Sequence, residues 1–422
     1  MALILDHWLM GTLSHLLSCS AVLLTAYSSA QSVEVLHEFG DEGDGASPFW
    51  SGLMIDHGVA YGVTSNGGSD GYGAVYKLNL DGSGYSVLYS FGGGADGAFP
   101  QTTLTLAGGA LYGTTSRGGI GDIFNGGGTV FRMNLDGTGF AVLHSFTYDE
   151  GGRTQTALTV NEDTIFGATY GNSGFGSPTF GGAIFKMKTD GTDYSALHAF
   201  NTSTDGAHPQ GALTLSGNVL FGTTSQSGPG NGGTIFKMGV DGSGFAVLFF
   251  FGGAENSFDP RGTLVLKDNV LYGTNYRGGL SNDGFGTVFS LNTDGTNFHR
   301  LHAFLERAEE RNPWAGLTLA GTTLYGTTSA GGSDHGAVFQ VNTDGSDYRV
   351  LDSFAGDDGS IPVGELVLDG TALYGNTWHG GRNDAGVIFS LAVPEPSAGL
   401  LLVVAGSCSF CSRRRTPGRN GA

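Results

Sequence analysis

The sequence predicts an all-β fold, a seven-bladed β-propeller with four-stranded blades. An aromatic-Gly pair recurs seven times at intervals of about 50 residues, a spacing typical of propeller blades. Each interval holds four short β-branched or aromatic runs between turn residues, and such runs are strand signals. The two ends of the array are complementary half-blades. The seven pairs are Tyr61-Gly62, Tyr112-Gly113, Phe166-Gly167, Phe221-Gly222, Tyr272-Gly273, Tyr325-Gly326 and Tyr374-Gly375.

We expect four strands, A to D, in every repeat unit. In the second unit they are Leu104–Leu106 for A, Leu111–Thr115 for B, Thr129–Asn134 for C and Val142–Phe146 for D. No stretch between residues 33 and 392 carries a sustained helical period. Evenly spaced short strands of this kind favour a closed radial array.

An Asp-Gly pair links segments C and D in six units. Between apolar runs, Asp-Gly supports a positive φ and therefore a tight hairpin, so C and D are expected to be antiparallel neighbours. The pairs are Asp81-Gly82, Asp136-Gly137, Asp190-Gly191, Asp241-Gly242, Asp294-Gly295 and Asp344-Gly345. The chain's 76 glycines are expected mainly to serve tight turns and close contacts between blades.

The ends of the array predict how the ring closes. The first unit begins with an unpaired D segment, Val35–Phe39, and the last ends with an unpaired C segment, Gly386–Leu391. In a ring these two segments meet, and the N-terminal strand completes the seventh blade. Closure removes the exposed sheet edges that an open array would leave.

Residues 1–30 are expected to be a signal peptide, followed by the repeat body at residues 31–392. The apolar run Cys19–Ala26 precedes Ser28-Ser29-Ala30, whose small residues fit cleavage after Ala30. Leu16–Cys19 also loosely resembles a lipoprotein box.

Residues 393–422 form a tripartite ending. A Pro-Glu-Pro motif precedes an apolar run from Ala398 to about Cys411, expected to be a short helix, and an arginine cluster follows. The run is short for a full membrane span, which needs roughly 17 to 25 residues, and the arginines favour a cytoplasmic end. An ordinary tail anchor with an accidental Pro-Glu-Pro is the alternative. The residues are Pro394, Glu395, Pro396, Arg413, Arg414 and Arg415.

This ending resembles the PEP-CTERM sorting signal. The resemblance implies processing by an exosortase after transient anchoring in the inner membrane. It also implies a final location at the cell surface or extracellular matrix of a Gram-negative bacterium.

The repeats carry a second resemblance. The pattern LYGTTSxGG…GxVFxxNxDG, over residues 33–392, is similar to the GloVer tandem repeat of bacterial proteins with variable C-terminal anchors. The last unit departs from it at Asn376-Thr377-Trp378. The resemblance implies architecture and localisation, and it brings no known catalytic residues.

Charge and cysteine content exclude several classes of function. The chain has a net charge of -19; Asp6 contributes -1 and the tail from Val393 contributes +3, which leaves the body at -21. Nucleic-acid binding and anionic-membrane binding need clustered Lys and Arg, so the body is not expected to do either. The cysteines are Cys19, Cys408 and Cys411, so a doubly processed body has no thiol and no disulfide.

We expect no catalytic, cofactor or metal site. The Asp-Gly turns lack the alternating carboxylates of a calcium loop. The His of segment D, as in His37 and His144, is replaced by Tyr89, Phe249 and Asp352 in other units. A position that alternates with Tyr and Phe fills an aromatic-sized space. No H-E-x-x-H or G-x-S-x-G motif is present.

Residues that break the repeat are the candidates for ligand binding. In propellers the B–C and D–A loops share the face around the channel mouth. Exposed aromatic residues with polar neighbours are typical of contacts with carbohydrate or peptide. The alternative is that these departures from the repeat are sequence drift in the loops and have no function. The candidates are Tyr170, Tyr276, Arg277, His335, Trp378 and His379.

Two functions remain open. The first is an exported, surface- or matrix-associated non-enzymatic repeat protein that binds exopolysaccharide or another cell-surface component. The second is a propeller enzyme that acts on extracellular glycans through carboxylates at the channel mouth. Near-equivalent blades favour the first.

Overall fold

The computed structural model describes residues 32–393, except 42, 122, 124–125, 172–180, 253–256, 280–283, 306–309 and 332–333. The predicted signal peptide, its cleavage site at Ala30, the Pro-Glu-Pro motif and the C-terminal helix and arginines lie outside the described residues. Within the described part, no helix is long and apolar enough to cross a membrane.

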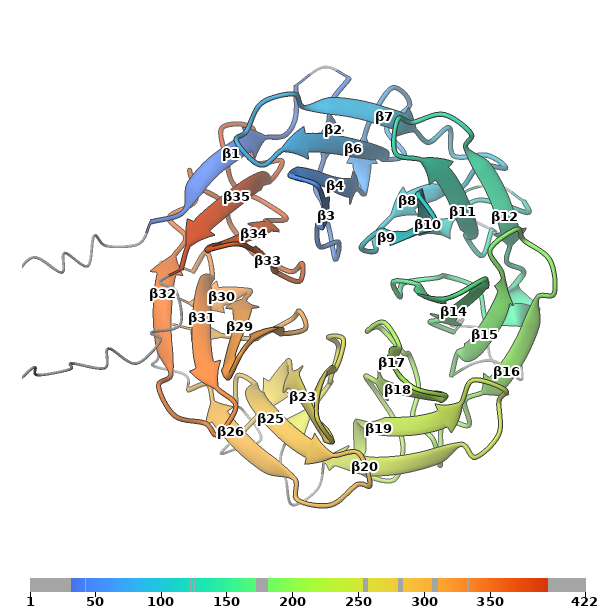
Figure 1. The fold of residues 1–422 in the computed structure, drawn as a ribbon, viewed down its shortest axis with the longest axis vertical. Coiled ribbons are helices and arrows are strands. Elements are labelled where there is room, and N and C mark those ends of the chain that lie inside the picture. Colours follow the sequence, from blue (N-terminus) through green and yellow to red (C-terminus); the bar gives the residue numbers. More distant parts are fainter. Residues whose placement is uncertain are drawn as a thin grey trace, which may run out of the picture.

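Seven antiparallel sheets form a closed ring around a central axis, so the predicted all-β propeller is confirmed (Figure 1). We number the blades 1 to 7 along the chain and give each from its inner strand A to its outer strand D. Blades 1 to 3 are β3 (Met54–Asp56), β4 (Val59–Thr64), β6 (Ala74–Asn79) and β7 (Ser86–Ser90); β9 (Thr105–Ala107), β10 (Ala110–Arg117), β11 (Thr129–Asn134) and β12 (Ala141–Ser145); β13 (Thr159–Asn161), β14 (Thr164–Thr169), β15 (Ala183–Lys188) and β16 (Ser195–Ala199).

Blades 4 to 7 repeat this order. They are β17 (Thr214–Ser216), β18 (Val219–Thr224), β19 (Asn231–Gly239) and β20 (Ala246–Gly252); β22 (Val265–Lys267), β23 (Val270–Asn275), β25 (Thr287–Asn292) and β26 (His299–Ala303); β28 (Thr318–Ala320), β29 (Thr323–Thr328), β31 (Ala337–Asn342) and β32 (Arg349–Ser353); β33 (Val367–Asp369), β34 (Ala372–Asn376), β35 (Val387–Ala392) and β1 (Glu34–Glu38).

Short additional elements occur beside the four-stranded blades. In blade 2, β8 (Ala98–Pro100) adds a fifth strand against the end of β10. A 3-10 turn, η1 (Tyr148–Glu150), follows β12. Three two-stranded pairs connect loops, namely β2 (Gly45–Ala46) with β5 (Asn66–Gly67), β21 (Ser257–Phe258) with β24 (Arg277–Gly278), and β27 (Glu310–Arg311) with β30 (Ala330–Gly331).

The ring closes as the complementary ends predicted. β1 pairs antiparallel with β35, with Val35 opposite Phe389, and Figure 1 shows these two strands side by side in blade 7. The Val33 amide donates to Asp352 Oδ2 of blade 6 at 2.6 Å. On the other side, the Arg382 amide donates to Glu38 Oε2 at 2.9 Å. The closing strand is therefore tied to both its own blade and its neighbour.

The aromatic-Gly pair serves packing in two directions. On strand B of blade 4, Gly222 lies directly opposite Phe236 of strand C. A Cβ at position 222 would lie 2.5 Å from Phe236 Cζ, so only glycine leaves room for the ring. Phe221 points the other way and packs in one buried cluster with Leu271 and Phe289 of blade 5. The core is thus built between neighbouring blades.

The LTL motif of segment A joins neighbouring inner strands. Thr105 Oγ1 donates to the Leu158 carbonyl at 2.6 Å, and Thr214 Oγ1 donates to the Leu264 carbonyl at the same distance. Each bond crosses from one blade to the next, which explains a hydroxyl in an otherwise apolar segment.

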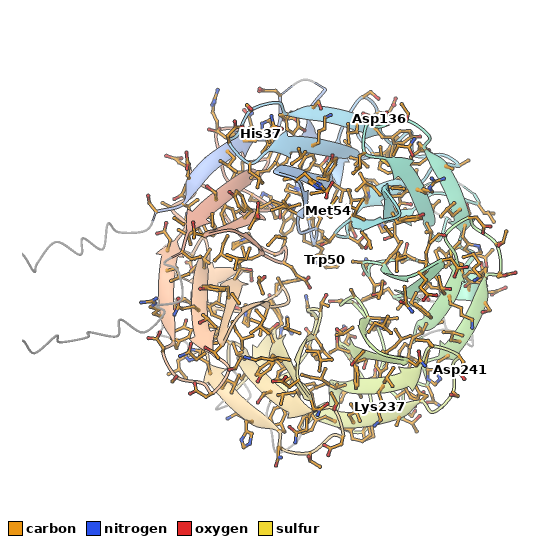
Figure 2. All side chains as sticks on the ribbon, in the orientation of Figure 1. His37, Trp50, Met54, Asp136, Lys237 and Asp241 are labelled. Atoms are coloured by element: carbon orange, nitrogen blue, oxygen red, sulfur yellow. The ribbon has the colours of Figure 1, made fainter. Side chains whose placement is uncertain are left out.

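The Asp-Gly turns form the predicted hairpins. In blade 2, Asp136 Oδ1 accepts from the Thr138 hydroxyl at 2.6 Å and from its amide at 3.0 Å, and these bonds hold the pKa of Asp136 below its usual range. Gly137 has φ 89°, and a Cβ there would lie 2.9 Å from the Leu88 carbonyl of blade 1. Figure 2 places Asp136 and Asp241 at the circumference of the ring. The carboxylate thus has a role within the turn itself.

The recurring His of strand D fills an aromatic-sized space, as predicted. His144 stacks on Tyr194 of the next blade at 3.9 Å between ring centres, and its Nε2 lies 3.2 Å from Glu150 Oε1. In blade 4 the equivalent Phe249 stacks on Phe298 at 4.2 Å. The position is therefore part of the packing between outer strands.

Candidate ligand-binding site at the mouth of the central cavity

The D–A and B–C loops lie at the same end of the ring, as the sequence predicted. The pair β21–β24 joins the D–A loop before blade 5 to its B–C loop, and β27–β30 does the same in blade 6. We call this end the mouth. Side chains from all seven blades line a cavity there, at the centre of the ring.

One position of the repeat places side chains at the mouth. In six blades a proline comes shortly before the leucine that opens the inner strand, and we call the residue after this proline the rim position. In blade 3, Thr154 replaces the proline, and in blade 1 an extra residue makes the rim Phe49-Trp50. From blade 2 to blade 7 the rim residues are Gln101, Gln155, Gln210, Arg261, Trp314 and Val363.

Aromatic side chains gather on one side of the mouth and form what we call the aromatic arc: Phe49, Trp50, Tyr276, Trp314 and Trp378. Ring centres are 5.8 Å apart for Trp50 and Trp314, and 4.6 Å for Tyr276 and Trp314. Phe49 lies 4.4 Å from Trp50 and 4.3 Å from Trp378. The arc therefore contains every tryptophan of the described part of the chain. Figure 2 shows Trp50 near the centre of the ring.

Arg261 is held within the aromatic arc by charge and by stacking. Its guanidinium carbon lies 4.0 Å from the centre of the Trp314 ring and 4.3 Å from that of Tyr276. Its Nε donates to Asp259 Oδ1 at 2.9 Å, and its second nitrogen bonds Oδ2 at 2.5 Å. Both side chains are largely buried, so the bidentate pair neutralises its own charge.

Glu365 contributes the carboxylate of the cavity lining. Its Oε1 accepts from the Thr263 amide at 3.1 Å, and its carboxylate also accepts from the Gly316 amide. A Cβ on Gly316 would lie 2.5 Å from this oxygen, so glycine lets the side chain cross blade 6 to reach blade 5. The Glu365 side chain is partly exposed to the cavity but lies in the interior of the molecule. This burial disfavours the charged carboxylate and so raises the pKa of Glu365.

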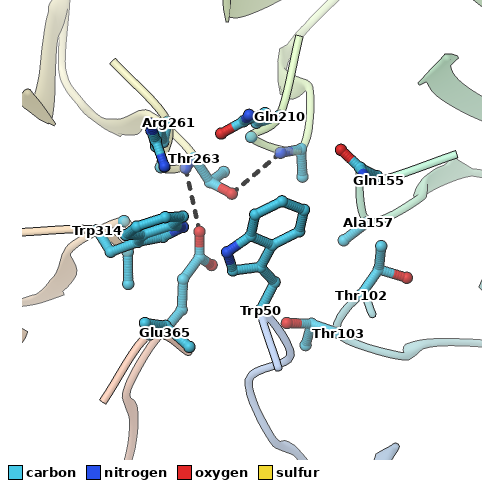
Figure 3. A pocket seen from close by; sticks show the side chains of 16 residues that line it. Trp50, Thr102, Thr103, Gln155, Ala157, Gln210, Arg261, Thr263, Trp314 and Glu365 are labelled. Carbon is cyan, nitrogen blue, oxygen red and sulfur yellow. Dashed lines mark hydrogen bonds between the residues drawn. The ribbon is translucent and has the colours of Figure 1, made fainter. Parts of the chain in front are cut away.

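Thr102, Thr103, Gln155 and Gln210 form a polar arc on the other side of the mouth. Figure 3 shows the Trp50 indole standing between Trp314 and Arg261 on one side and Gln155 on the other. Next to Gln210, Tyr170 hydrogen-bonds that amide and stacks on His208 at 4.4 Å. Burial raises the pKa of Tyr170.

Two polar atoms of the cavity lining are buried without a protein partner in the described part of the chain. They are the indole nitrogen Nε1 of Trp50 and the side-chain oxygen of Gln155. Gln101, at the equivalent rim position of blade 2, has the same feature. Buried polar atoms are nearly always hydrogen-bonded, so these atoms call for water or ligand partners. The space for water-sized molecules is about 50 Å³, enough for a few waters.

The structure brings three of the six predicted candidates to the cavity mouth. Tyr276 and Trp378 belong to the aromatic arc, and Tyr170 adjoins the polar arc. Arg277 is exposed, with its guanidinium 5.4 Å from the Tyr276 ring centre. His335 instead faces Ser360 Oγ at 2.9 Å, and His379 faces Asp384 Oδ2 at 3.6 Å.

Sequence reasoning missed Trp50, Arg261, Trp314 and Glu365. They lie before or at the start of strand A, whereas the candidates were sought in the B–C loops. The available signal was the rim position, whose residue type changes between blades while the leucine of the inner strand stays. Among the described residues, no three His, Cys, Asp or Glu side chains are grouped so as to hold a metal ion.

These features define a closed seven-bladed repeat propeller with one asymmetric cavity mouth. The Gloeobacter/Verrucomicrobia repeat pattern matches the chain three times, over residues 8–228, 125–333 and 216–406. The chain therefore belongs to the Gloeobacter/Verrucomicrobia repeat family, which confirms the GloVer resemblance. No curated protein matches it.

Solved propellers share the fold at low sequence identity. The GH74 xyloglucanase of Xanthomonas campestris has a TM-score of 0.56 at 11% identity, covering 87% of this chain and 55% of its own. The oligogalacturonate lyase of Vibrio parahaemolyticus has a TM-score of 0.55 at 12% identity, with coverages of 87% and 95%. An oligogalacturonate lyase in complex with manganese has 0.53 at 12%, with 86% and 97%. These likenesses concern the fold alone.

Proposed function

We propose that this protein is an exported, surface- or matrix-associated binding module without enzymatic activity. The observation that carries the proposal is the aromatic arc, a set of partly exposed rings gathered at one mouth of an otherwise regular ring. Aromatic rings with adjoining polar groups are typical of recognition sites.

The two acids at the mouth support binding rather than catalysis. Asp259 is paired with Arg261 through both carboxylate oxygens, and Glu365 accepts main-chain amides from two blades. A general acid or base must reach the atom whose proton it transfers. Carboxylates bound in this way act instead to hold the loops of the mouth in place.

The terminal segments support export and sorting. The apolar run before Ala30 is the basis for a cleaved signal peptide, and the resemblance of the tail to PEP-CTERM is the basis for exosortase processing. Both segments join the ring near the closing strand, because Val33 bonds Asp352 and the Val393 amide donates to the Thr371 carbonyl at 2.7 Å. Their removal would leave every strand of the ring in place.

A localisation experiment tests sorting. Deletion of residues 393–422 should release the protein into the medium, while replacement of Ser397 by Ala, a change outside the motif and the arginines, should leave it cell-associated. Equal cell association of the deletion variant and the wild type would show that the tail is not a sorting signal.

An activity assay tests the second candidate, a glycan-degrading enzyme, which is favoured only by the names of the xyloglucanase and lyase neighbours. The purified protein is incubated with a panel of plant and bacterial polysaccharides, and reducing ends and unsaturated products are measured. We expect no product above a heat-denatured control. Product release from any polymer would replace the binding proposal with an enzymatic one.

A further inference from the structure

We propose that the cavity mouth binds the terminal sugar of a neutral glycan, end-on. The inference rests on the proposed function and names its ligand class. It uses three properties of the mouth, namely its division into two kinds of surface, its charge and its size.

The two arcs match the two surfaces of a pyranose ring. A sugar ring has an apolar face of C–H groups and an edge of hydroxyls. The aromatic arc offers large flat rings in Trp50 and Trp314, and the polar arc opposite offers the side-chain amides of Gln155 and Gln210. A ligand held between the arcs would stack on one side and hydrogen-bond on the other.

The unpartnered polar atoms supply complementary bonds for a hydroxyl edge. The Trp50 indole nitrogen is a donor, and the Gln155 side-chain oxygen is an acceptor, and both are buried without a protein partner in the described residues. A hydroxyl group both donates and accepts, so one or two hydroxyls satisfy these atoms. A purely apolar ligand would leave them unpaired at a cost in free energy.

Charge selects a neutral ligand. The guanidinium of Arg261 is already neutralised by Asp259, and the remaining carboxylate of the cavity is Glu365. The body around the mouth carries a net charge of -21 once the terminal segments are set aside. Uronates and other acidic sugars would meet repulsion, because Arg261, the cation among the described residues that line the cavity, is already paired.

The size of the cavity favours a chain end. The space for water-sized molecules, about 50 Å³, is too small to enclose a sugar ring, so only the hydroxyls of one ring edge can enter. The rest of the glycan would extend away from the mouth into solvent. The non-reducing terminal residue has only one glycosidic linkage, so its unlinked edge can enter end-on, whereas every residue inside a chain or in a cyclic glycan is linked at both ends of the ring.

Intrinsic fluorescence provides a direct readout. The chain has four tryptophans, and Trp8→Phe leaves Trp50, Trp314 and Trp378, all in the aromatic arc. The full chain with this substitution is purified in a detergent with a polyoxyethylene headgroup, which avoids sugar headgroups. It is titrated with cellohexaose, xylohexaose, mannohexaose, maltohexaose, α-cyclodextrin and hexagalacturonate.

We expect saturable quenching or enhancement by at least one linear neutral hexasaccharide, and none by α-cyclodextrin or hexagalacturonate. The matching disaccharide should bind within about threefold of the hexasaccharide, because only the terminal residue makes contacts. The absence of a response to every linear neutral probe overturns the proposal. So does a response limited to hexagalacturonate, or equal binding of maltohexaose and α-cyclodextrin.

Site variants distinguish stacking in the aromatic arc from nonspecific binding elsewhere on the protein surface. Trp314→Ala should weaken binding by at least about tenfold, the effect of removing an aromatic anchor, and Trp314→Phe should restore most of it. Gln155→Ala should weaken binding by about fivefold. Phe250→Ala is the matched control, because Phe250 is 41% exposed on outer strand D of blade 4, away from the mouth. Equal losses in the control and in Trp314→Ala would overturn the assignment to the mouth.

Failure of this inference is distinguishable from failure of the proposed function. A protein that is sorted to the surface and releases no product, yet gives no fluorescence response, leaves the binding module intact with another ligand class. Product release from a polysaccharide overturns the proposed function itself, whatever the fluorescence shows.

Discussion

Replacement of Gly222 by Ala should destabilise the propeller by about 1–2 kcal/mol. The new Cβ would lie 2.5 Å from Phe236 Cζ and 3.0 Å from Leu213 Cδ2, and Phe236 is fully buried, so the ring has to shift within a packed interface. Overpacking of this kind costs about 1–3 kcal/mol. Alanine also lowers the conformational entropy of the unfolded chain, and this effect offsets about 0.4–1 kcal/mol of the destabilisation. Gly222 does not have a positive φ, so backbone strain adds nothing.

The assay is urea unfolding followed by circular dichroism, with Gly94→Ala as the matched control. Gly94 also lacks a positive φ, and a Cβ there would meet no atom within 4 Å, so this variant should be as stable as the wild type or slightly more stable. The double variant Gly222→Ala with Phe236→Leu should show a favourable coupling, since leucine lacks the clashing ring carbon. A Gly222→Ala protein with wild-type stability would refute the claim that cross-strand ring packing selects the glycine.

Three further predictions concern His302, Asp352 and Glu365. Burial lowers the pKa of His302 from 6.5 to about 4, so the unfolded chain binds a proton that the folded chain excludes, and the free energy of unfolding should fall as pH drops from 6.5 toward 4. His302→Phe, which introduces the residue that blade 4 has at the equivalent Phe249, should flatten that part of the pH profile of the urea midpoint; an unchanged slope would contradict it. Asp352→Ala removes the acceptor of the Val33 amide and should lower stability by about 1 kcal/mol while accelerating amide exchange in β1; exchange equal to wild type would argue against a closing role. Glu365→Gln keeps an acceptor for the Thr263 amide, whereas Glu365→Ala leaves it unpaired and should cost about 1–3 kcal/mol more in urea unfolding; equal stability of the two variants would show that Glu365 is not a structural acceptor.

The fold was predictable because each of its features repeats. The same ring is indicated by seven aromatic-Gly pairs, six Asp-Gly turns and two complementary ends. Because the signal is repeated many times, a chance match at one position does not change the prediction. The sequence did not, however, reveal why glycine follows each aromatic residue. That reason is the ring of a strand C residue, such as Phe236, which lies opposite only after the strands have paired.

The site was predictable only in part because it depends on the contacts between blades. Tyr276 and Trp378 were found because they interrupt the repeat in B–C loops. Arg261 was missed because its partners are the adjacent Asp259 and rings from two other segments, Tyr276 and Trp314. The interaction of Glu365 with Thr263, 102 residues earlier in the chain, arises only from the curvature of the ring.

Stability and recognition use different positions of the same repeat. The leucine that opens strand A is present in all seven units and is buried against its neighbours, as with Leu213 and Leu264. The rim position a few residues earlier changes from Gln to Arg, Trp and Val between blades. The rim residues of six blades line the cavity and lie outside the buried apolar clusters between blades, so a change there leaves those clusters intact. A ring of near-identical blades can therefore hold one asymmetric mouth, and other chains with this repeat should differ in ligand mainly through the residues at their rim positions.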